Sequence, residues 1–221
     1  MVSIAIDGPS GAGKSTLAKR LAQALGYLYV DTGALYRSIG LAVLRAGKSP
    51  NCEADIRACL PNIALELRYL DGTQHVFLNG EDVSEEIRKE RVSMAASGVS
   101  AFSSVRDFLS ETQRSMAREN NVIMDGRDIG TVILPNATIK IFLTASAEVR
   151  AERRTRELLA KGQNAVYDEV LTDIKQRDYN DEHRAVAPLC KAEDAILLET
   201  SGDDFEHAYQ KLYEVVQKGL C

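Results

Sequence analysis

The sequence predicts an α/β fold in which helices flank a central parallel sheet. Short apolar runs alternate with helical patterns along most of the 221 residues, as in chains built from strand–helix–strand units. Most of these runs end in polar residues, as expected where a site forms beyond the carboxyl ends of parallel strands. A hydrophobic content of 45% and a charged content of 27% are typical of a globular chain with one full core.

The alternation places the elements in a definite order. Apolar residues spaced by three and four indicate helices, and short continuous apolar runs indicate buried strands. The predicted elements are a strand at 2–6, a helix ending at Gly26, a strand at 27–30, a helix at about 35–46 closed by Gly47, strands at 122–124, 139–143 and 195–198, and helices around Arg150 and over 167–184.

One segment breaks the alternation. Apolar and polar residues alternate strictly over 63–69, a turn is expected at 71–72, a strand resumes at 76–78, and Asn79-Gly80 indicates another turn. This pattern predicts an antiparallel hairpin within an inserted subdomain at about 58–90. The alternative is an ordinary surface excursion of the main sheet.

A phosphate-binding motif lies between the first strand and the first helix. Residues 8–15 match the pattern G-x-x-x-x-G-K-[ST] in full, which predicts a P-loop NTPase fold that binds a nucleoside triphosphate. Backbone N–H groups would surround the phosphates, Lys14 would reach the β- and γ-phosphates, and the Ser15 hydroxyl would ligate Mg²⁺. The residues expected to bind ATP are Gly8, Pro9, Ser10, Gly11, Ala12, Gly13, Lys14, Ser15 and Thr16.

Composition excludes several other classes of protein. The net charge of −5 argues against a general nucleic-acid binder, because there is no basic excess to neutralise phosphates. No run approaches the ~20 apolar residues of a membrane span, and the opening segment lacks the basic region of a signal peptide. We therefore expect a cytoplasmic monomer. Its four cysteines show no metal-type spacing and are expected to be free thiols, and the three scattered histidines do not indicate a metal site.

Two loops after predicted strands carry arginine where an anion would bind. Thr32 follows the second strand and is expected to cap the next helix, with Arg37 one turn inside it. Asp125 follows the run 122–124, at the position where P-loop proteins often place an acid near Mg²⁺, and Arg127 and Asp128 come next. The alternatives are a helix cap with a solvated arginine and a charged surface turn.

Two predicted helices add further charged candidates. The helix over 167–184 has one face that is apolar at its start and charged at its end, which indicates a solvated pocket beside the core. This face consists of Val170, Ile174, Arg177, Asp181 and Arg184. The earlier helix carries Arg150, Arg153, Arg154 and Arg156 among glutamates. That group is either a lid that closes on the triphosphate or a solvated face.

Several of these segments together resemble the bacterial-type cytidylate kinases, a nucleoside monophosphate kinase branch of the P-loop proteins. The matching segments are IDGPSGAGKST at 6–16, DTGALYR at 31–37, AASGVSAFSSVR at 95–106, DGRDIGTV at 125–132, KIFLTAS at 140–146 and RDYNDEHRAVAPL at 177–189. The resemblance implies a single P-loop kinase domain over 1–221, in which 58–90 is the monophosphate-binding insert and 150–165 is a helical lid.

The resemblance also assigns roles to individual residues. The residues implied to bind CMP are Thr32, Tyr36, Arg37, Ser97, Arg106, Arg127, Asp128, Arg177, Asp181 and Arg184. Within this set Ser97, Arg106 and Asp128 would read the cytosine, and Arg177 and Asp181 would hold the pentose. Lys14, Arg127 and Arg184 would be catalytic, and Arg153 in the lid would bind ATP.

The implied reaction transfers the γ-phosphoryl group of ATP to CMP, or to dCMP, in the presence of Mg²⁺. It needs no general base, because the acceptor phosphate is already anionic, so catalysis consists of positioning and charge stabilisation. The alternatives are a kinase that acts on UMP, AMP or a non-nucleotide acid, and a switch that binds ATP and hydrolyses it slowly without an acceptor.

Overall fold

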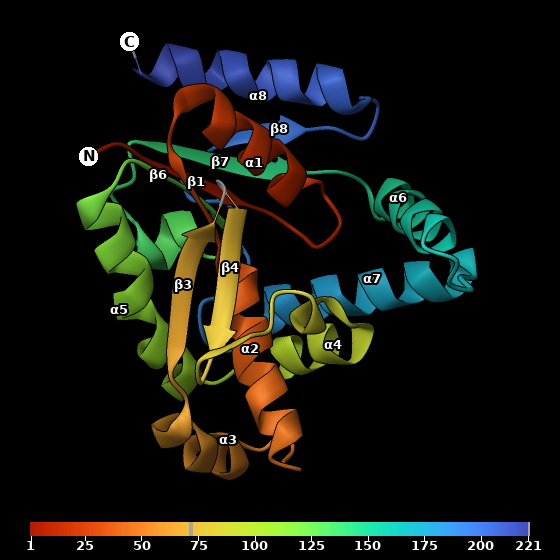
Figure 1. Ribbon diagram of the computed structural model, residues 1–221. Helices are drawn as coiled ribbons and strands as arrows, with labels where there is room; N and C mark the ends of the chain where they lie inside the picture. Colours follow the sequence, from red (N-terminus) through yellow and green to blue (C-terminus); the bar gives the residue numbers. More distant parts are fainter. Residues whose placement is uncertain (71–72, 221) are drawn as a thin grey trace. The chain divides into compact units, whose positions relative to one another are not determined.

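The computed structural model describes residues 1–70 and 73–220, and the chain forms two compact units (Figure 1). One unit consists of Met1–Tyr29 and Asn120–Cys221, and we call it the P-loop unit. The other consists of Val30–Glu119, and we call it the α2 unit. Each unit has its own hydrophobic core, so each is described separately.

A five-stranded sheet forms the centre of the P-loop unit, with the strand order β2-β6-β1-β7-β8. The strands are β1 (Ser3–Asp7), β2 (Leu28–Asp31), β6 (Val122–Gly126), β7 (Ile139–Thr144) and β8 (Ile196–Glu199), and β2 enters this unit with Leu28 and Tyr29. Strands β6, β1, β7 and β8 pair in parallel. The predicted parallel sheet and the positions of its strands are confirmed.

Helices α1 (Lys14–Leu25) and α8 (Phe205–Leu220) pack beside each other against this sheet (Figure 1). Their apolar residues recur at helical spacing, so Leu17 and Leu21 of α1 meet Leu212 of α8 in one core with the buried isoleucines of β1. The register aligns Ile6 with Asp125 and Asp7 with Gly126, which brings the ends of β1 and β6 to one level.

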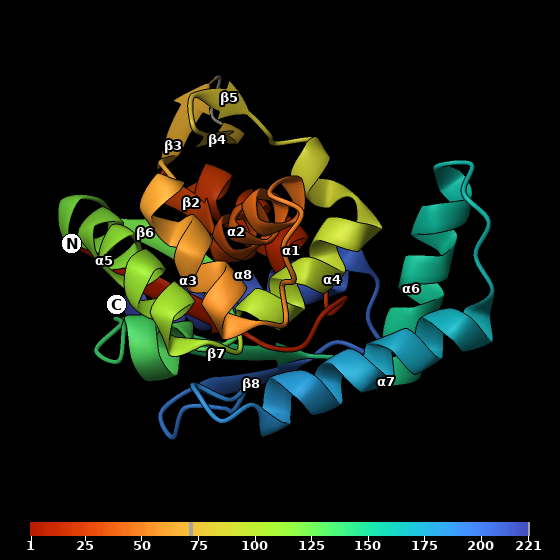
Figure 2. The same cartoon turned by 90° about the horizontal axis from the view of Figure 1, so that it is seen from below.

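Two further helices, α6 (Ala147–Ala160) and α7 (Tyr167–His183), pack against each other in the same unit (Figure 2). Both were predicted, and the continuous helix over the charged stripe is confirmed up to His183. A short π-helical segment, η3 (Ile129–Ile133), follows β6 after two residues, Arg127 and Asp128. Its backbone N–H groups bond five residues back, from Ile133 to Asp128 and from Leu134 to Ile129.

The α2 unit surrounds α2 (Thr32–Arg45), whose apolar face is buried. Around it lie α3 (Glu53–Cys59), η1 (Leu60–Asn62), η2 (Glu86–Arg88), α4 (Glu90–Val99), α5 (Ser103–Glu119) and a sheet of β3 (Leu65–Leu70), β4 (Thr73–Leu78) and β5 (Glu81–Asp82). Leu35 and Ile39 of α2 share a core with Val76 of β4 and Val92 of α4.

The predicted hairpin is confirmed as β3 and β4, which pair antiparallel from Leu65↔Leu78 to Leu70↔Thr73 and form a separate small sheet with β5 (Figure 2). The expected turn at 71–72 lies outside the described residues. Asn79 and Gly80 form the expected second turn, with φ values of 51° and 84°.

Within residues 1–70 and 73–220, no helix is both long and apolar enough to cross a membrane. Cys52, Cys59 and Cys190 are free thiols, and the predicted free thiol at Cys221 lies outside the described residues.

Candidate active site

The loop between β1 and α1 has a backbone path that depends on glycine at two positions, Gly8 and Gly13. Gly8 lies so close to β7 that a Cβ built on it would be 1.9 Å from the carbonyl oxygen of Leu143. Gly13 caps α1 at φ 88°, a left-handed conformation, and no side chain caps this helix end. The N-terminal N–H groups of α1 therefore have no side-chain acceptor at the cap, as a phosphate-binding loop requires.

Lys14 is buried at the first position of α1, and its Nζ donates to the carbonyl oxygen of Pro9 at 2.7 Å. Burial, followed by the positive charge of Arg127, lowers the pKa of Lys14 to about 7. Asp125 and Asp7 act in the opposite direction. The ammonium group is thus largely removed from water. In these surroundings a bound phosphate would stabilise its charge strongly.

Ser15 and Asp125 place oxygen atoms beside the loop. The Ser15 hydroxyl donates to Asp125 Oδ2 at 2.8 Å, and the Tyr29 hydroxyl donates to Asp125 Oδ1 at 2.7 Å. Asp125 is buried at the end of β6, so its carboxylate is held in place by two hydroxyl groups. A hydroxyl and one carboxylate next to a phosphate loop are a suitable donor set for Mg²⁺, which usually binds few protein oxygens and completes its shell with phosphate and water.

A charged cluster follows β6. Arg127 Nε donates to Asp181 Oδ2 at 2.8 Å, and its Nη1 donates to the Gly126 carbonyl at 3.2 Å. Arg184 lies with Nη1 3.9 Å from Asp181 Oδ1 and Nη2 3.6 Å from Asp128 Oδ1. Asp128, Asp181 and Arg184 are all nearly inaccessible to water. The structure thus brings together residues of two segments that the sequence marked separately.

In this cluster, attraction between Asp181 and the neighbouring arginines outweighs the effect of burial on the pKa values. Burial alone would raise the pKa of Asp181, but Arg127, Arg184 and Arg177 lower it below its ordinary value. In the same way, burial alone would lower the pKa of Arg127, but the negative charge of Asp181 raises it above its ordinary value. Asp181 therefore stays ionised and orients two guanidinium groups, which are well suited to a phosphate.

Asp31, and not Thr32, caps α2. Asp31 Oδ1 accepts from the Ala34 N–H at 3.0 Å, and Oδ2 accepts from Arg37 Nη2 at 2.8 Å. The expectation that Thr32 caps this helix is wrong, because Asp31 already has the extended backbone of a cap residue and Thr32 is the first helical residue, buried at 2% exposure. Burial would raise the pKa of Asp31, but Arg37 lowers it.

The remaining candidates of the α2 unit lie close together. Arg106 is buried, donates from Nε to the Ser100 carbonyl at 2.8 Å, and has its guanidinium carbon 5.5 Å from the centre of the Tyr36 ring. Ser100 in turn donates to the Ser97 carbonyl at 2.9 Å. The buried Nε of Arg37 makes no hydrogen bond within residues 1–70 and 73–220, so this donor is available to an oxygen atom of a ligand.

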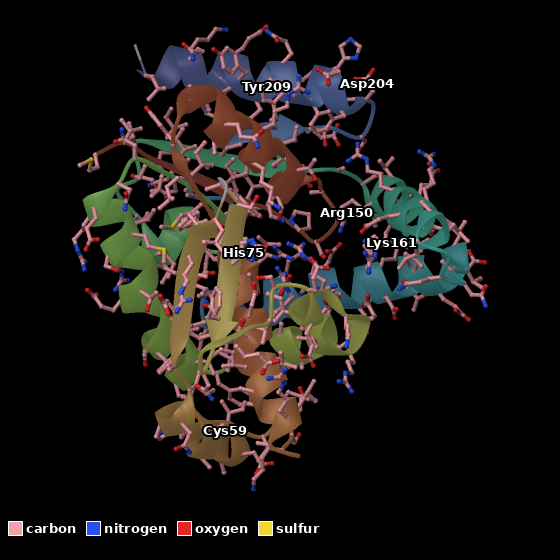
Figure 3. All side chains as sticks on the ribbon, viewed as in Figure 1. Cys59, His75, Arg150, Lys161, Asp204 and Tyr209 are labelled. Carbon is pink, nitrogen blue, oxygen red and sulfur yellow. The ribbon has the colours of Figure 1, made fainter. Side chains whose placement is uncertain are left out.

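Arg150 lies on α6 (Figure 3) and, unlike Arg153, Arg154 and Arg156, is buried. Its guanidinium group donates to the carbonyls of Ala145 at 2.8 Å and Ser10 at 3.0 Å. It also forms a bidentate ion pair with Asp178 of α7, with N–O distances of 3.0 and 2.5 Å. It therefore connects the phosphate loop to α7. Arg150 is therefore not part of a solvated face, and its place in a lid remains a prediction.

The other arginines of α6 have local partners. Arg153 donates to the carbonyls of Thr200 at 2.7 Å and Asp203 at 3.3 Å. Arg154 and Arg156 pair with glutamates of their own helix, as does Lys161 just beyond its end (Figure 3), which fits a solvated face. The predicted lid at 150–165 and the role of Arg153 toward ATP remain predictions.

Three functional contacts were not predicted from the sequence: the Asp31 cap, the Arg150–Asp178 pair and the bond from Tyr29 to Asp125. A signal existed only for the first, since Asp is as good a cap residue as Thr. The other two join residues that lie 28 and 96 positions apart.

Comparison with known proteins identifies the family. A family model described as cytidylate kinase matches residues 4–218. A protein named cytidylate kinase from Caldicellulosiruptor bescii is 50% identical over 217 residues, which cover 98% of this chain and 96% of that protein. Another from Caldanaerobacter subterraneus subsp. tengcongensis is 51% identical over 217 residues, with 98% and 95% covered.

Among solved structures, an uncharacterized protein from Eubacterium ventriosum superposes with a TM-score of 0.56 at 13% identity, covering 98% of this chain and 99% of that one. That similarity shows a shared fold only. The family model, by contrast, spans nearly the whole sequence, phosphate loop and charged cluster included. The chain belongs to the cytidylate kinase family.

Proposed function

We propose that this protein transfers the γ-phosphoryl group of ATP to CMP and yields ADP and CDP, with dCMP as a second acceptor. The observation that carries the proposal is the charged cluster at the end of β6, in which Asp181 orients Arg127 and Arg184 in the same unit as the phosphate loop. In a protein of this family, such a cluster suits a second phosphate besides those of ATP.

Transfer would occur directly, in line between the two phosphates. Lys14 would stabilise the charge that develops on the transferred group, and its burial strengthens that interaction. Arg127 and Arg184 would neutralise the acceptor, so that two anions can approach each other. No side chain needs to remove a proton, because the attacking oxygen is already ionised at neutral pH.

Mg²⁺ would be held by the Ser15 hydroxyl and, directly or through water, by Asp125. The chemistry that Mg²⁺ would supply there is positive charge against the phosphates of ATP. Tyr29 donates to the other oxygen of Asp125 and so fixes the carboxylate toward Ser15.

The resemblance to cytidylate kinases supplies the proposed contacts with CMP. Asp128 would accept from the cytosine amino group, with Ser97 and Arg106 on the O2 and N3 side of the ring, and Arg177 and Asp181 would hold the pentose. Arg37 would contact the acceptor phosphate, which supplies an acceptor for its buried Nε, beside Thr32 and Tyr36. We also propose that a single chain suffices, because all these groups come from one monomer.

A coupled assay of ADP formation tests the proposal. Purified protein is given ATP and Mg²⁺ with CMP, dCMP, UMP, AMP or no acceptor. We expect fast turnover with CMP and dCMP, and little without an acceptor. Equal ATP hydrolysis with and without CMP would support the switch alternative, and preference for another acceptor would contradict the assignment of CMP.

A further inference from the structure

Asp7 is a buried acid to which no role has yet been assigned. It is the last residue of β1 and is 5% exposed. Its Oδ1 accepts from the backbone N–H of Ile129 at 2.8 Å, and its Oδ2 accepts from the N–H of Gly130 at 2.7 Å. Both oxygens are thus directed at two consecutive amides of η3, 122 and 123 positions further along the chain.

These amides need an acceptor from outside their own turn. The first N–H groups of any helical turn have no partner within it, and Asp128, the residue before η3, makes no side-chain cap. Asp7 satisfies both N–H groups from a neighbouring strand. It therefore fixes the backbone directly after Asp128, whose own carbonyl accepts from Val132 and Ile133 at 2.9 and 3.2 Å.

A carboxylate is the side chain that this position requires. Two N–H donors side by side need two acceptors, and an amide of the same shape would turn its NH₂ toward one of them. Burial disfavours the charged form and raises the pKa of Asp7 to about 6, although the two backbone hydrogen bonds act to lower it. Asp128 adds a like charge and Lys14 an opposite one.

We propose that Asp7 is a positioning residue that sets the choice of acceptor base by holding Asp128 in place. The inference rests on the proposed function, in which Asp128 reads the cytosine amino group. Asp128 is buried, and on its other side it faces Arg184 at 3.6 Å. A shift of the backbone at 129–130 would move the Asp128 carboxylate relative to the base. The chemical identity of every side chain that contacts CMP would stay the same.

A double-mutant cycle tests this inference. The variants are Asp7→Asn, Asp128→Asn and the double variant, and the measurement is the ratio of kcat/KM for CMP to that for UMP. We expect each single change to lower the ratio, by roughly tenfold. In the double variant the ratio should fall no further, because Asp7 acts through Asp128. The KM for CMP should rise in Asp7→Asn, and the KM for ATP should stay within about twofold.

Asp7→Glu is the matched control for charge. It keeps the negative charge near Lys14 but is longer by one methylene, so it cannot place both oxygens at the same points. If the inference is right, Asp7→Glu lowers the CMP/UMP ratio as Asp7→Asn does. A wild-type ratio in Asp7→Glu would show that charge alone matters and would overturn the positioning role.

The outcomes separate the inference from the proposed function. An unchanged ratio in Asp128→Asn contradicts Asp128 as the base reader. A lowered ratio in Asp128→Asn with an unchanged ratio in Asp7→Asn overturns the role of Asp7, and so do additive effects in the double variant. If Asp7→Asn does not fold, amide NMR of the wild type decides: the Ile129 and Gly130 resonances should shift with CMP but not with UMP, and a shift with neither overturns the inference.

Discussion

Lys14 combines two properties that rarely occur together, a cationic group and a nearly dry environment. An ammonium ion in such a place is poorly solvated, and its Nζ donates to the carbonyl of Pro9. Charge that develops on a transferred phosphoryl group would meet it at low effective dielectric constant, where electrostatic stabilisation is largest.

We therefore expect Lys14→Ala to abolish phosphoryl transfer while the protein remains folded. The loss of kcat should be on the order of 10² or more. Steady-state kinetics with ATP and CMP measures the loss, and circular dichroism checks the fold. Near-normal turnover in a folded variant would refute the P-loop assignment.

Arg37, Arg127 and Arg184 should each matter more to the acceptor than to ATP. Lysine at any of the three positions keeps the charge but lacks the planar fork that binds a carboxylate or phosphate through two bonds. We expect each Arg→Lys variant to raise the KM for CMP more than the KM for ATP. Unchanged CMP kinetics in all three, with weaker ATP binding, would show that the acceptor site is misplaced.

The ionisation of Asp7 predicts how stability depends on pH. Its pKa is about 6 in the folded protein and near 3.8 when unfolded, so the folded state binds more protons between these values and loses stability as the pH rises through them. From about pH 4 to about pH 7, the wild type should lose on the order of 2–3 kcal/mol of unfolding free energy relative to Asp7→Asn. Urea titrations of both proteins at each pH measure this difference, and parallel pH profiles would contradict it.

At the scale of elements, the sequence predicted the helices and strands well because their signals are local. Periodicity and the position of Gly26 suffice for α1, and strict alternation suffices for β3. Two contacts between elements were not predicted, the bonds from Asp7 to Ile129 and from Arg150 to Asp178. They depend on which strands and helices pack together, and spacing along the chain carries no information about these particular pairs.

The pair between Arg150 and Asp178 should be important for stability. Asp178→Asn leaves a buried guanidinium without its counter-charge, so the free energy of unfolding should fall by about 3 kcal/mol. Glu152→Gln is the matched control, because it breaks the exposed pair with Arg156 on the same helix and should change stability by about 0.5 kcal/mol or less. Equal effects of the two changes in urea titrations would show that Arg150 does not depend on Asp178.

At the scale of the whole molecule, the α/β class was predictable and the division into two units was not. The alternation of strands and helices reveals the parallel sheet, but no local pattern shows that α2, α4, α5 and the small sheet share a core of their own. The candidate site residues stay predictions, which the sequence allowed because most of them follow strands or lie on one helix face.

Ligand protection tests which segments contact CMP. The proposed contacts predict that CMP slows amide hydrogen exchange around residues 31–38 and around residues 125–131. A non-hydrolysable ATP analogue with Mg²⁺ should slow exchange mainly at 8–16. Exchange measured by mass spectrometry tests this, and protection by CMP in one segment only would confine the acceptor site to that segment.

The close approach of Gly8 to β7 has a practical consequence. A methyl group at this position would overlap the carbonyl oxygen of Leu143, which lies 1.9 Å from where the Cβ would be, so the phosphate loop of Gly8→Ala has to leave its path. Every ionisable side chain and the net charge of −5 stay the same. This substitution thus gives a charge-matched inactive reference, against which effects of shape and effects of charge in the other variants can be told apart.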